Sequence, residues 1–379
     1  MTAPLRVLLI SHTCQSRTEG HPRAERLACL PGVDLRVLVP DRWRHYGRWR
    51  RPEAPPDGAF ALETGRVAWP WAGPAQSYLH WYPGLAGTLR RFRPDVIDLW
   101  EEPWGLVSAQ VCWLRGRLLP QAKIVSETEQ NISRRLPPPF EGLRRYTLGR
   151  TDYAVARSAE ALQVLREKGY TGPGGVVPNA VDADLFRPLD RERCRAALNI
   201  PGFLVGYVGR LVEEKGLADH IDALRFCSSE VQCVFVGDGP FRGALEERAR
   251  AAGKSGQVHF LPGRPQEELP PLMNAFDALA LVSHTTSTWK EQFGRVIIEA
   301  HACATPVIGS SSGAIPGVIG AGGLVVPEKD PKAFAGAIER LRADPAQART
   351  LGALGRAQVE AHYTWERVTE RMLEIFKGL

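Results

Sequence analysis

Two carboxylates, Glu291 and Glu299, are separated by seven residues in the stretch EQFGRVIIEA. The apolar run at 276–282 predicts a buried strand before them, and the pattern over 297–303 predicts a helix after Gly294. Glu291 would then lie in a loop at the carboxyl end of a strand, and Glu299 on the helix that follows. Ligands of open α/β sheets bind at such strand ends.

This arrangement suits a ligand that carries a sugar, a phosphate and a ribose. We expect the Glu291 carboxylate to be free to accept hydrogen bonds from sugar hydroxyls, and Gly294 to let the backbone approach the ligand closely. The first N–H groups of the helix, near Arg295 and Val296, would meet a phosphate. Glu299 would hold a vicinal diol such as a ribose. A solvated helix face also commonly carries two carboxylates at this spacing, so the pair alone does not define a site.

Two cations follow another predicted strand, at 204–208. Arg210 and Lys215 would flank the gap between that strand and the helix predicted from Leu217. There they could clamp a diphosphate, each charge-assisted hydrogen bond being worth roughly 1.5–3 kcal/mol. Two exposed charges in a surface turn are the simpler interpretation of either residue taken alone.

The surrounding motifs carry a family resemblance. Glu299 precedes the strand TPVI at 305–308 and a glycine-rich loop at 309–313, and the segment VVPNAVDADLFRP spans 176–188. In this order they resemble the C-terminal half of retaining glycosyltransferases of family 4, which have the GT-B fold. The family usually has Glu-Gly-Phe-Gly before the helix, where this chain has Gln292 in place of the first glycine. The resemblance runs from about Val176 to the end of the chain, and the first half matches only in layout.

The resemblance implies a hexosyltransferase that moves a sugar from a UDP- or GDP-sugar to an acceptor hydroxyl, in glycan or glycolipid assembly. Arg210 and Lys215 would bind the diphosphate and neutralise the leaving group, with Glu291 as the third catalytic residue. It implies donor sugar and phosphate contacts at Gln292, Phe293, Gly294, Arg295 and Val296, a ribose contact at Glu299, and base contacts at Gly237, Pro262 and Arg264.

The acceptor side departs from the family pattern. Many members have a histidine after the strand that ends here near Ser126, and this chain has Glu127 and Glu129 instead. The Gly-Gly turn that often follows the first strand is also missing, with a glycine only at Gly20 and His12 nearer the strand. The acceptor-side candidates are therefore His12, Gly20, Glu127 and Glu129, which could equally be loop residues that satisfy backbone groups.

Alternating strands and helices predict an α/β chain of two Rossmann-like domains. The family resemblance places them on either side of a central cleft. We expect an N-terminal acceptor-binding domain at residues 1–178 and a C-terminal donor-binding domain at 179–361. Residues 362–379 would form a helix that crosses back to the N-terminal domain.

Composition bounds the remaining possibilities. Apolar content of 44% and charged content of 24% are ordinary for a globular chain, and the net charge of +6 is modest. Seven cysteines without a Cys-x-x-Cys spacing argue against a disulfide framework or a zinc site and favour a reducing cytoplasm. We expect no signal peptide, and we see no apolar run that would span a bilayer and no Asp-x-Asp placed to hold a catalytic metal. We therefore expect no metal and no cofactor besides the nucleotide sugar.

Residues 42–82 interrupt the pattern with arginines, prolines and aromatic residues, and eight of the ten tryptophans precede residue 114. Such a segment could stack on sugars or make a peripheral contact with the inner face of the membrane. It could equally be a surface excursion that packs over a sheet edge. No recognised motif accompanies the charge, so nucleic acid is not an expected partner.

Two other classes of function fit the same predicted fold. A nucleotide-sugar epimerase, or a phosphorylase, would use the donor site without transfer to a separate acceptor hydroxyl. A phosphorylase of the pyridoxal type would need a buried lysine on the cofactor, and nothing in the sequence identifies one. A non-catalytic scaffold would bind a nucleotide sugar or lipid, but the complete set Arg210, Lys215, Glu291 and Glu299 argues against that function.

Overall fold

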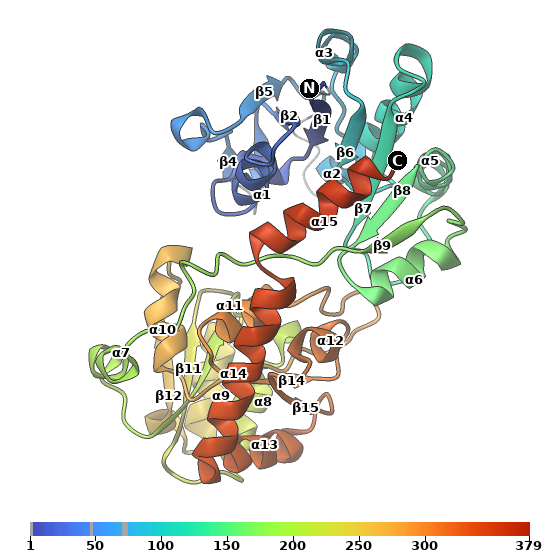
Figure 1. Ribbon diagram of the computed structural model, residues 1–379. Coiled ribbons are helices and arrows are strands. Elements are labelled where there is room, and N and C mark those ends of the chain that lie inside the picture. The colour runs from blue at the N-terminus through green and yellow to red at the C-terminus, as the bar shows by residue number, and fades with distance from the viewer. Residues whose placement is uncertain (1–2, 46–47, 70–74) are drawn as a thin grey trace. The chain divides into compact units, whose positions relative to one another are not determined.

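The computed structural model describes the chain except residues 1–2, 46–47 and 70–74. It divides into two compact units, one of Met1–Pro178 with Val368–Leu379, and one of Asn179–Arg367. Each unit is built on a parallel sheet covered by helices (Figure 1). The prediction of an α/β chain with two Rossmann-like units is confirmed.

The first unit has a seven-stranded parallel sheet in the order β5-β2-β1-β6-β7-β8-β9. Successive strands run outward from β1 through β2 to β5, and the order then restarts on the other side of β1 with β6. The topological switch point therefore lies between β1 and β6. The strands are β1 (Leu5–Ile10), β2 (Val33–Pro40), β5 (Ala61–Gly65), β6 (Val96–Leu99), β7 (Lys123–Thr128), β8 (Tyr153–Ala156) and β9 (Gly174–Val176).

Helices connect these strands because each parallel pair needs a crossover. Leu85 and Leu89 of one helix and Val107 and Val111 of the next pack with Ile97 and other strand residues into one core. The helices are α1 (His21–Ala28), α2 (Gln76–Leu79), α3 (Leu85–Phe92), α4 (Leu106–Leu118), α5 (Pro138–Leu148) and α6 (Ala159–Glu167), and α15 (Trp365–Lys377) joins this unit from Val368 onward.

The segment 42–82 is more regular than its sequence indicates. A hairpin forms from β3 (Trp43–His45) and β4 (Arg48–Arg50), and β5 then adds an edge strand beside β2, with Leu62 opposite Val37. Trp43 and Tyr82 are buried, whereas Trp49 and Trp69 are about half exposed. Trp71, which the sequence analysis included in this segment, lies outside the described residues. Much of the aromatic content is therefore packing.

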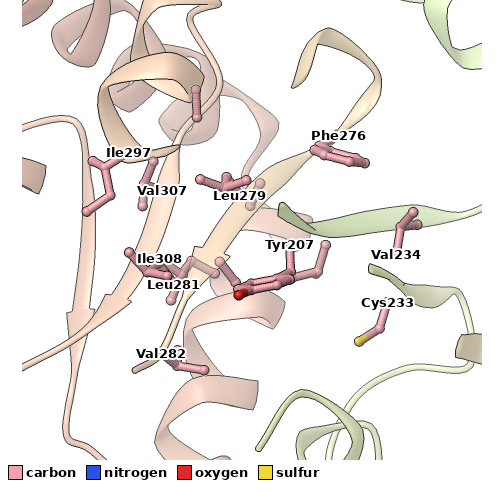
Figure 2. Packing of buried hydrophobic residues seen from close by; sticks show 14 of the residues in the cluster. Tyr207, Cys233, Val234, Phe276, Leu279, Leu281, Val282, Ile297, Val307 and Ile308 are labelled. Atoms are coloured by element: carbon pink, nitrogen blue, oxygen red, sulfur yellow. The ribbon is translucent and has the colours of Figure 1, made fainter. Parts of the chain in front are cut away.

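The second unit has a six-stranded parallel sheet in the order β12-β11-β10-β13-β14-β15, with its switch point between β10 and β13. Side chains from β10, β11, β13, β14 and α11 pack into its core (Figure 2). The strands are β10 (Phe203–Val208), β11 (Val231–Val236), β12 (Val258–Leu261), β13 (Ala278–Leu281), β14 (Val307–Ser310) and β15 (Gly323–Val326).

Aspartates begin three helices of this unit. Asp190, Asp330 and Asp344 each accept a backbone N–H bond from the residue three positions later, which satisfies a donor at the helix start. The helices are α7 (Arg191–Leu198), α8 (Leu217–Ala223), α9 (Arg242–Ala251), α10 (Leu269–Ala275), α11 (Arg295–Ala302), α12 (Ile315–Ile319), α13 (Pro331–Ala343) and α14 (Pro345–His362). In the described part of the chain, no helix combines the length and apolar character that crossing a bilayer requires.

Candidate active site

Lys215 and Glu291 meet at the switch point of the second sheet. Lys215 ends the loop after β10, Glu291 lies in the loop after β13, and Lys215 Nζ is 2.6 Å from Glu291 Oε2. Ser283 Oγ donates to the same oxygen at 3.1 Å. The Glu291 side chain is 10% exposed and that of Lys215 is 22% exposed. Glu291 is therefore buried and already engaged by an ammonium and a hydroxyl, and its role toward sugar hydroxyls stays a prediction.

The Lys215 ammonium is also held by an aromatic ring. Its Nζ lies 4.8 Å from the centre of the Trp289 ring, within the range of a cation–π interaction. A hydrogen bond of 2.7 Å between His284 Nε2 and Asp219 Oδ2 joins the loop after β13 to α8, the helix that follows Lys215. The Trp289 ring helps to fix the position of the cation before any ligand arrives.

Two glycines allow the helices to begin this close to the strand ends. Gly216, before α8, has φ of +67°, and a Cβ there would lie 1.9 Å from the carbonyl oxygen of Val282. Gly294, before α11, has φ of +82°, and a Cβ there would lie 2.9 Å from Leu281 Cδ2. Only glycine fits these positions without strain. The sequence analysis explained Gly294 by ligand approach, and the structure gives it a conformational reason as well.

The remaining predicted donor residues surround the start of α11. Phe293 is buried and its ring makes an edge contact with Tyr363, with 5.9 Å between ring centres, so its side chain belongs to the core. Gln292, Arg295 and Val296 are half-buried, and Arg295 is the first residue of the helix. This places backbone N–H groups and two polar side chains beside the Lys215–Glu291 pair.

Arg210 lies in the loop after β10, with an exposed side chain and a fixed backbone. The buried Tyr207 hydroxyl donates to the Arg210 carbonyl oxygen at 2.8 Å, and the Leu211 N–H donates to the Asp238 carbonyl oxygen at 3.0 Å. The structure therefore brings Arg210 to the same sheet edge as Lys215, as the sequence predicts.

The three residues predicted to contact the base differ in character. Gly237 has φ of +145° and a Cβ there would lie 2.0 Å from the Gly209 carbonyl oxygen, so it supports the loop that carries Arg210. Pro262 and Arg264 are exposed in the loop after β12, and Arg264 Nη1 is 3.1 Å from Glu268 Oε2. This loop reaches the same edge, because the Gly263 N–H donates to Asp238 Oδ2 at 3.1 Å.

Glu299 is a buried carboxylate on α11. Burial raises its pKa above the ordinary value, although the charge of Arg295 and a hydrogen bond from Gln266 act in the opposite direction. Gln266 Nε2 lies 3.5 Å from Glu299 Oε1. A buried carboxylate with such weak support costs stability, which is typical of a group retained for binding.

A second polar cluster lies at the switch point of the first sheet. His12, after β1, donates its backbone N–H to Glu101 Oε1 at 2.7 Å, and its Nδ1 lies 2.8 Å from Glu101 Oε2. The His12 ring stacks on Trp43 with 4.5 Å between ring centres. His80 Nε2 lies 3.8 Å from Glu101 Oε1. Sequence reasoning named His12 and missed Glu101 and His80, although Glu101 follows the strand next to β1 in the sheet.

The charges in this cluster depend on one another. Burial lowers the pKa of His12, but the charge of Glu101 and the hydrogen bond to it outweigh burial and raise that pKa above its ordinary value. Burial would raise the pKa of Glu101, and the two histidines lower it. The pKa of His80 is lowered by burial. The cluster therefore favours an imidazolium at His12 beside a carboxylate at Glu101.

Glu127 has a different environment from the one predicted. It is buried, its Oε1 is 2.5 Å from Arg23 Nη2, and its other oxygen is bonded to Arg157. Burial raises its pKa, but the two guanidiniums outweigh this effect and lower it. Glu127 is therefore part of a buried ion network and not an open loop carboxylate. Its arginine partners come from distant parts of the chain, and no local pattern identifies them.

The other acceptor-side candidates are Glu129 and Gly20. The Glu129 side chain is 38% exposed, with Oε1 3.7 Å from Arg157 Nε. Gly20 precedes α1, and a Cβ there would lie 2.5 Å from Cys14 Cα, so it serves close packing.

The sequence analysis also missed Glu102, which accepts a hydrogen bond from Thr128 Oγ1 at 2.6 Å and from the Glu129 N–H at 2.9 Å. Burial raises the pKa of Glu102 to about 8, so it holds a proton near neutral pH. Glu102 therefore belongs to the polar groups at this strand edge.

Comparison with known proteins places the chain in a family. The model of the family "Glycosyl transferases group 1" matches residues 190–358. A D-inositol 3-phosphate glycosyltransferase of Corynebacterium jeikeium is 30% identical over 322 residues, which cover 79% of this chain and 71% of that protein. One from Corynebacterium urealyticum is 33% identical over 245 residues, covering 59% of this chain and 56% of that protein.

Solved structures show the same fold. Sucrose-phosphate synthase from Thermosynechococcus elongatus has a TM-score of 0.76 at 22% identity, with 99% of this chain and 98% of that chain covered. HepE of Anabaena, solved in complex with UDP, has a TM-score of 0.76 at 19% identity, with 99% of this chain and 100% of that chain covered. Fold and relatives together define a glycosyltransferase with the GT-B fold. The chain belongs to the group 1 glycosyltransferases, as its motifs predict, and the relatives do not favour the epimerase, phosphorylase or scaffold alternatives.

Proposed function

We propose that the chain transfers a sugar from a UDP-sugar to an acceptor hydroxyl, with retention at the anomeric carbon and without a metal ion. The observation that carries the proposal is the contact of Lys215 with Glu291 at the switch point of the second sheet. It places a cation suited to a diphosphate directly beside a carboxylate suited to sugar hydroxyls. UDP as the nucleotide is supported by HepE, a protein of the same fold solved with UDP and with UDP-glucose.

The donor would be held by complementary charge. Lys215 has three N–H donors, so it can keep its bond to Glu291 while it donates to a phosphate oxygen. Arg210 and the N-terminus of α11 at Arg295 would meet the rest of the diphosphate. Glu299 would accept from the ribose diol, and the loops with Gly237, Pro262 and Arg264 would border the base. Protein cations in these positions would replace the metal ion that other transferases use to neutralise the diphosphate.

In the transfer step, the bond between the sugar C1 and the diphosphate oxygen breaks. The acceptor oxygen forms its bond to C1 on the face that the diphosphate leaves, and its proton passes to a phosphate oxygen. Charge that develops on the diphosphate is stabilised by Lys215 and Arg210, which are preorganised for it. Glu291 orients the sugar. This sequence of events retains the anomeric configuration and uses only groups that the donor and the chain supply.

We assign the acceptor to the switch point of the first sheet. His12 and Glu101 present an imidazolium and a carboxylate there, and the Trp43 ring stacks on His12. The partly exposed His12 would donate to an acidic group of a polyhydroxylated acceptor, and the buried Glu101 would hold the imidazolium in position. D-inositol 3-phosphate, which the names of the relatives give, therefore belongs in the panel of acceptors to test.

We also propose that the protein works in the cytoplasm. The support is chemical, because all seven cysteines are free thiols, as a reducing compartment maintains.

The test is a transfer assay with UDP-glucose, other UDP-sugars and GDP-mannose, each with EDTA and with a panel of acceptors. UDP release in the presence of EDTA, with an α-linked product from an α-configured donor by NMR, is the expected result. A β-linked product would contradict retention, and loss of activity that Mg²⁺ or Mn²⁺ restores would contradict metal independence. A changed sugar without release of UDP would indicate an epimerase instead.

A further inference from the structure

An apolar groove of about 700 Å³ opens on the first unit between α3, α4 and α5. Its lining is mainly apolar and includes Trp69, Trp81, Leu106, Trp113, Leu143 and Tyr146. Trp69 is 46% exposed and Trp113 47% exposed, although indole side chains are usually covered in a folded domain. Neither His12 nor Glu101 lines the groove, so the groove is not part of the proposed acceptor site.

The sequence of α4 explains why the groove is apolar. Val107, Val111 and Cys112 of this helix are buried in the core of the unit. At helical spacing, Leu106 and Trp113 fall on another face, which lines the groove. A surface helix normally carries polar residues opposite its buried stripe, whereas most of α4 is apolar on both faces. The outward face therefore has the composition of a contact surface.

Two arginines stack on aromatic rings that line the groove. The Arg117 guanidinium lies 4.4 Å from the centre of the Trp113 ring, and that of Arg150 lies 3.8 Å from the centre of the Tyr146 ring. Both arginines are exposed. On the three helices, Arg91, Arg115 and Arg144 pair with Glu63, Asp152 and Glu141, whereas Arg90, Arg117 and Arg145 are exposed.

We propose that this groove docks the protein on an anionic phospholipid bilayer. Tryptophan and tyrosine rings with arginines stacked on them match the boundary between acyl chains and head groups. The apolar floor would receive acyl chains, and the arginines would meet lipid phosphates. The inference goes beyond the donor site, since it concerns where the enzyme meets its surroundings and not how it binds UDP. It also places the membrane contact on α3, α4 and α5, outside most of the segment 42–82.

A second tryptophan–arginine pair provides a matched control. Trp49 is 51% exposed, and the Arg42 guanidinium lies 5.7 Å from the centre of its ring. This pair has the same chemistry as Trp113 and Arg117 but lies on the β3–β4 hairpin, outside the groove. Trp49→Ala therefore separates docking through the groove from general attraction of an aromatic, basic protein to lipid.

The experiment is co-sedimentation with vesicles of phosphatidylcholine alone and of phosphatidylcholine with phosphatidylglycerol. Wild-type protein should sediment with the anionic vesicles and remain in solution with the neutral ones. Trp113→Ala should weaken the partition about tenfold through lost apolar contact. Arg117→Ala should weaken it about fivefold, which corresponds to about 1 kcal/mol per arginine near an anionic surface. Trp49→Ala should bind as the wild type does.

Several results would overturn the inference. These are a wild-type protein that stays in solution with anionic vesicles, a Trp113→Ala variant that binds as tightly as wild type, or an equal loss in Trp49→Ala. A dimer in sedimentation equilibrium that Trp113→Ala dissociates, without vesicle binding by the wild type, would show that a second copy occupies the groove. Because Trp113 is half exposed, its loss should leave the fold intact, which circular dichroism and UDP binding check independently.

Discussion

Removing Lys215 and neutralising Glu291 should have opposite effects on diphosphate binding. Lys215→Ala removes the ammonium that we assign to the diphosphate. A charge-assisted hydrogen bond is worth roughly 1.5–3 kcal/mol, so the Kd for UDP should rise about 10- to 150-fold. Glu291→Gln removes the counter-charge 2.6 Å from Nζ and keeps a side chain of similar shape beside Ser283. The Lys215 ammonium then no longer divides its charge between Glu291 and the diphosphate. UDP should therefore bind the variant as tightly as the wild type or up to about fivefold more tightly.

The effects on turnover should separate the two roles further. Glu291→Gln should lower kcat roughly 10²-fold, because the sugar loses the carboxylate that orients it for attack. The assay is calorimetric titration with UDP in EDTA, together with initial rates of UDP release. Lys332→Ala is the control, since it removes one positive charge from an exposed position of the same unit. The reasoning is refuted if Lys215→Ala binds UDP as tightly as Lys332→Ala, or if Glu291→Gln loses as much UDP affinity as Lys215→Ala.

Three further variants test individual features of the site. Glu299→Gln should raise the melting temperature at pH 8, because burial raises the pKa of this carboxyl and its ionised form destabilises the folded protein. The same variant should bind UDP about tenfold more weakly in calorimetry, because it loses the carboxylate assigned to the ribose. Gly237→Ala should cost roughly 2–4 kcal/mol of unfolding free energy in urea, because its Cβ would meet the Gly209 carbonyl oxygen, whereas Gly243→Ala, with open space around it, should not destabilise the protein. Glu102→Gln should flatten the pH dependence of stability: the folded-state pKa of about 8 lies above the unfolded value, so the native protein binds more protons between about pH 4.5 and 8 and loses stability as pH rises. The difference at pH 8, on the order of 3 kcal/mol after allowance for partial exposure, should be absent from the thermal unfolding of the variant.

The sequence predicts the elements of the second unit closely, because each has a local signal. The strand predicted at 204–208 is β10 (Phe203–Val208), and the helix predicted over 297–303 is α11 (Arg295–Ala302). The edge strand β5 was missed. Its sequence, ALETG, contains little of the apolar alternation that marks a half-buried strand, and its pairing with β2 is a tertiary effect.

The site residues, too, divide into features that have a local signal in the sequence and features that have none. The positions of Arg210, Lys215 and Glu291 at strand ends could be predicted because each follows a strand with a clear pattern. That Glu291 is buried against Lys215, 76 residues away in sequence, has no local signal. The pairing of His12 with Glu101 is equally nonlocal, since the two residues are 89 positions apart in the sequence. Strand order creates both contacts, since the two residues of each pair follow neighbouring strands at a switch point.

The central claim is that the second unit binds a nucleoside diphosphate at its switch point without metal. Calorimetric titration of the full chain with UDP, GDP and ADP in EDTA tests it most directly, with Arg210→Ala beside the wild type. The account predicts micromolar binding of UDP, with GDP and ADP weaker, and loss of that binding in Arg210→Ala. Absence of binding to all three diphosphates, or UDP binding that Arg210→Ala leaves unchanged, would contradict it.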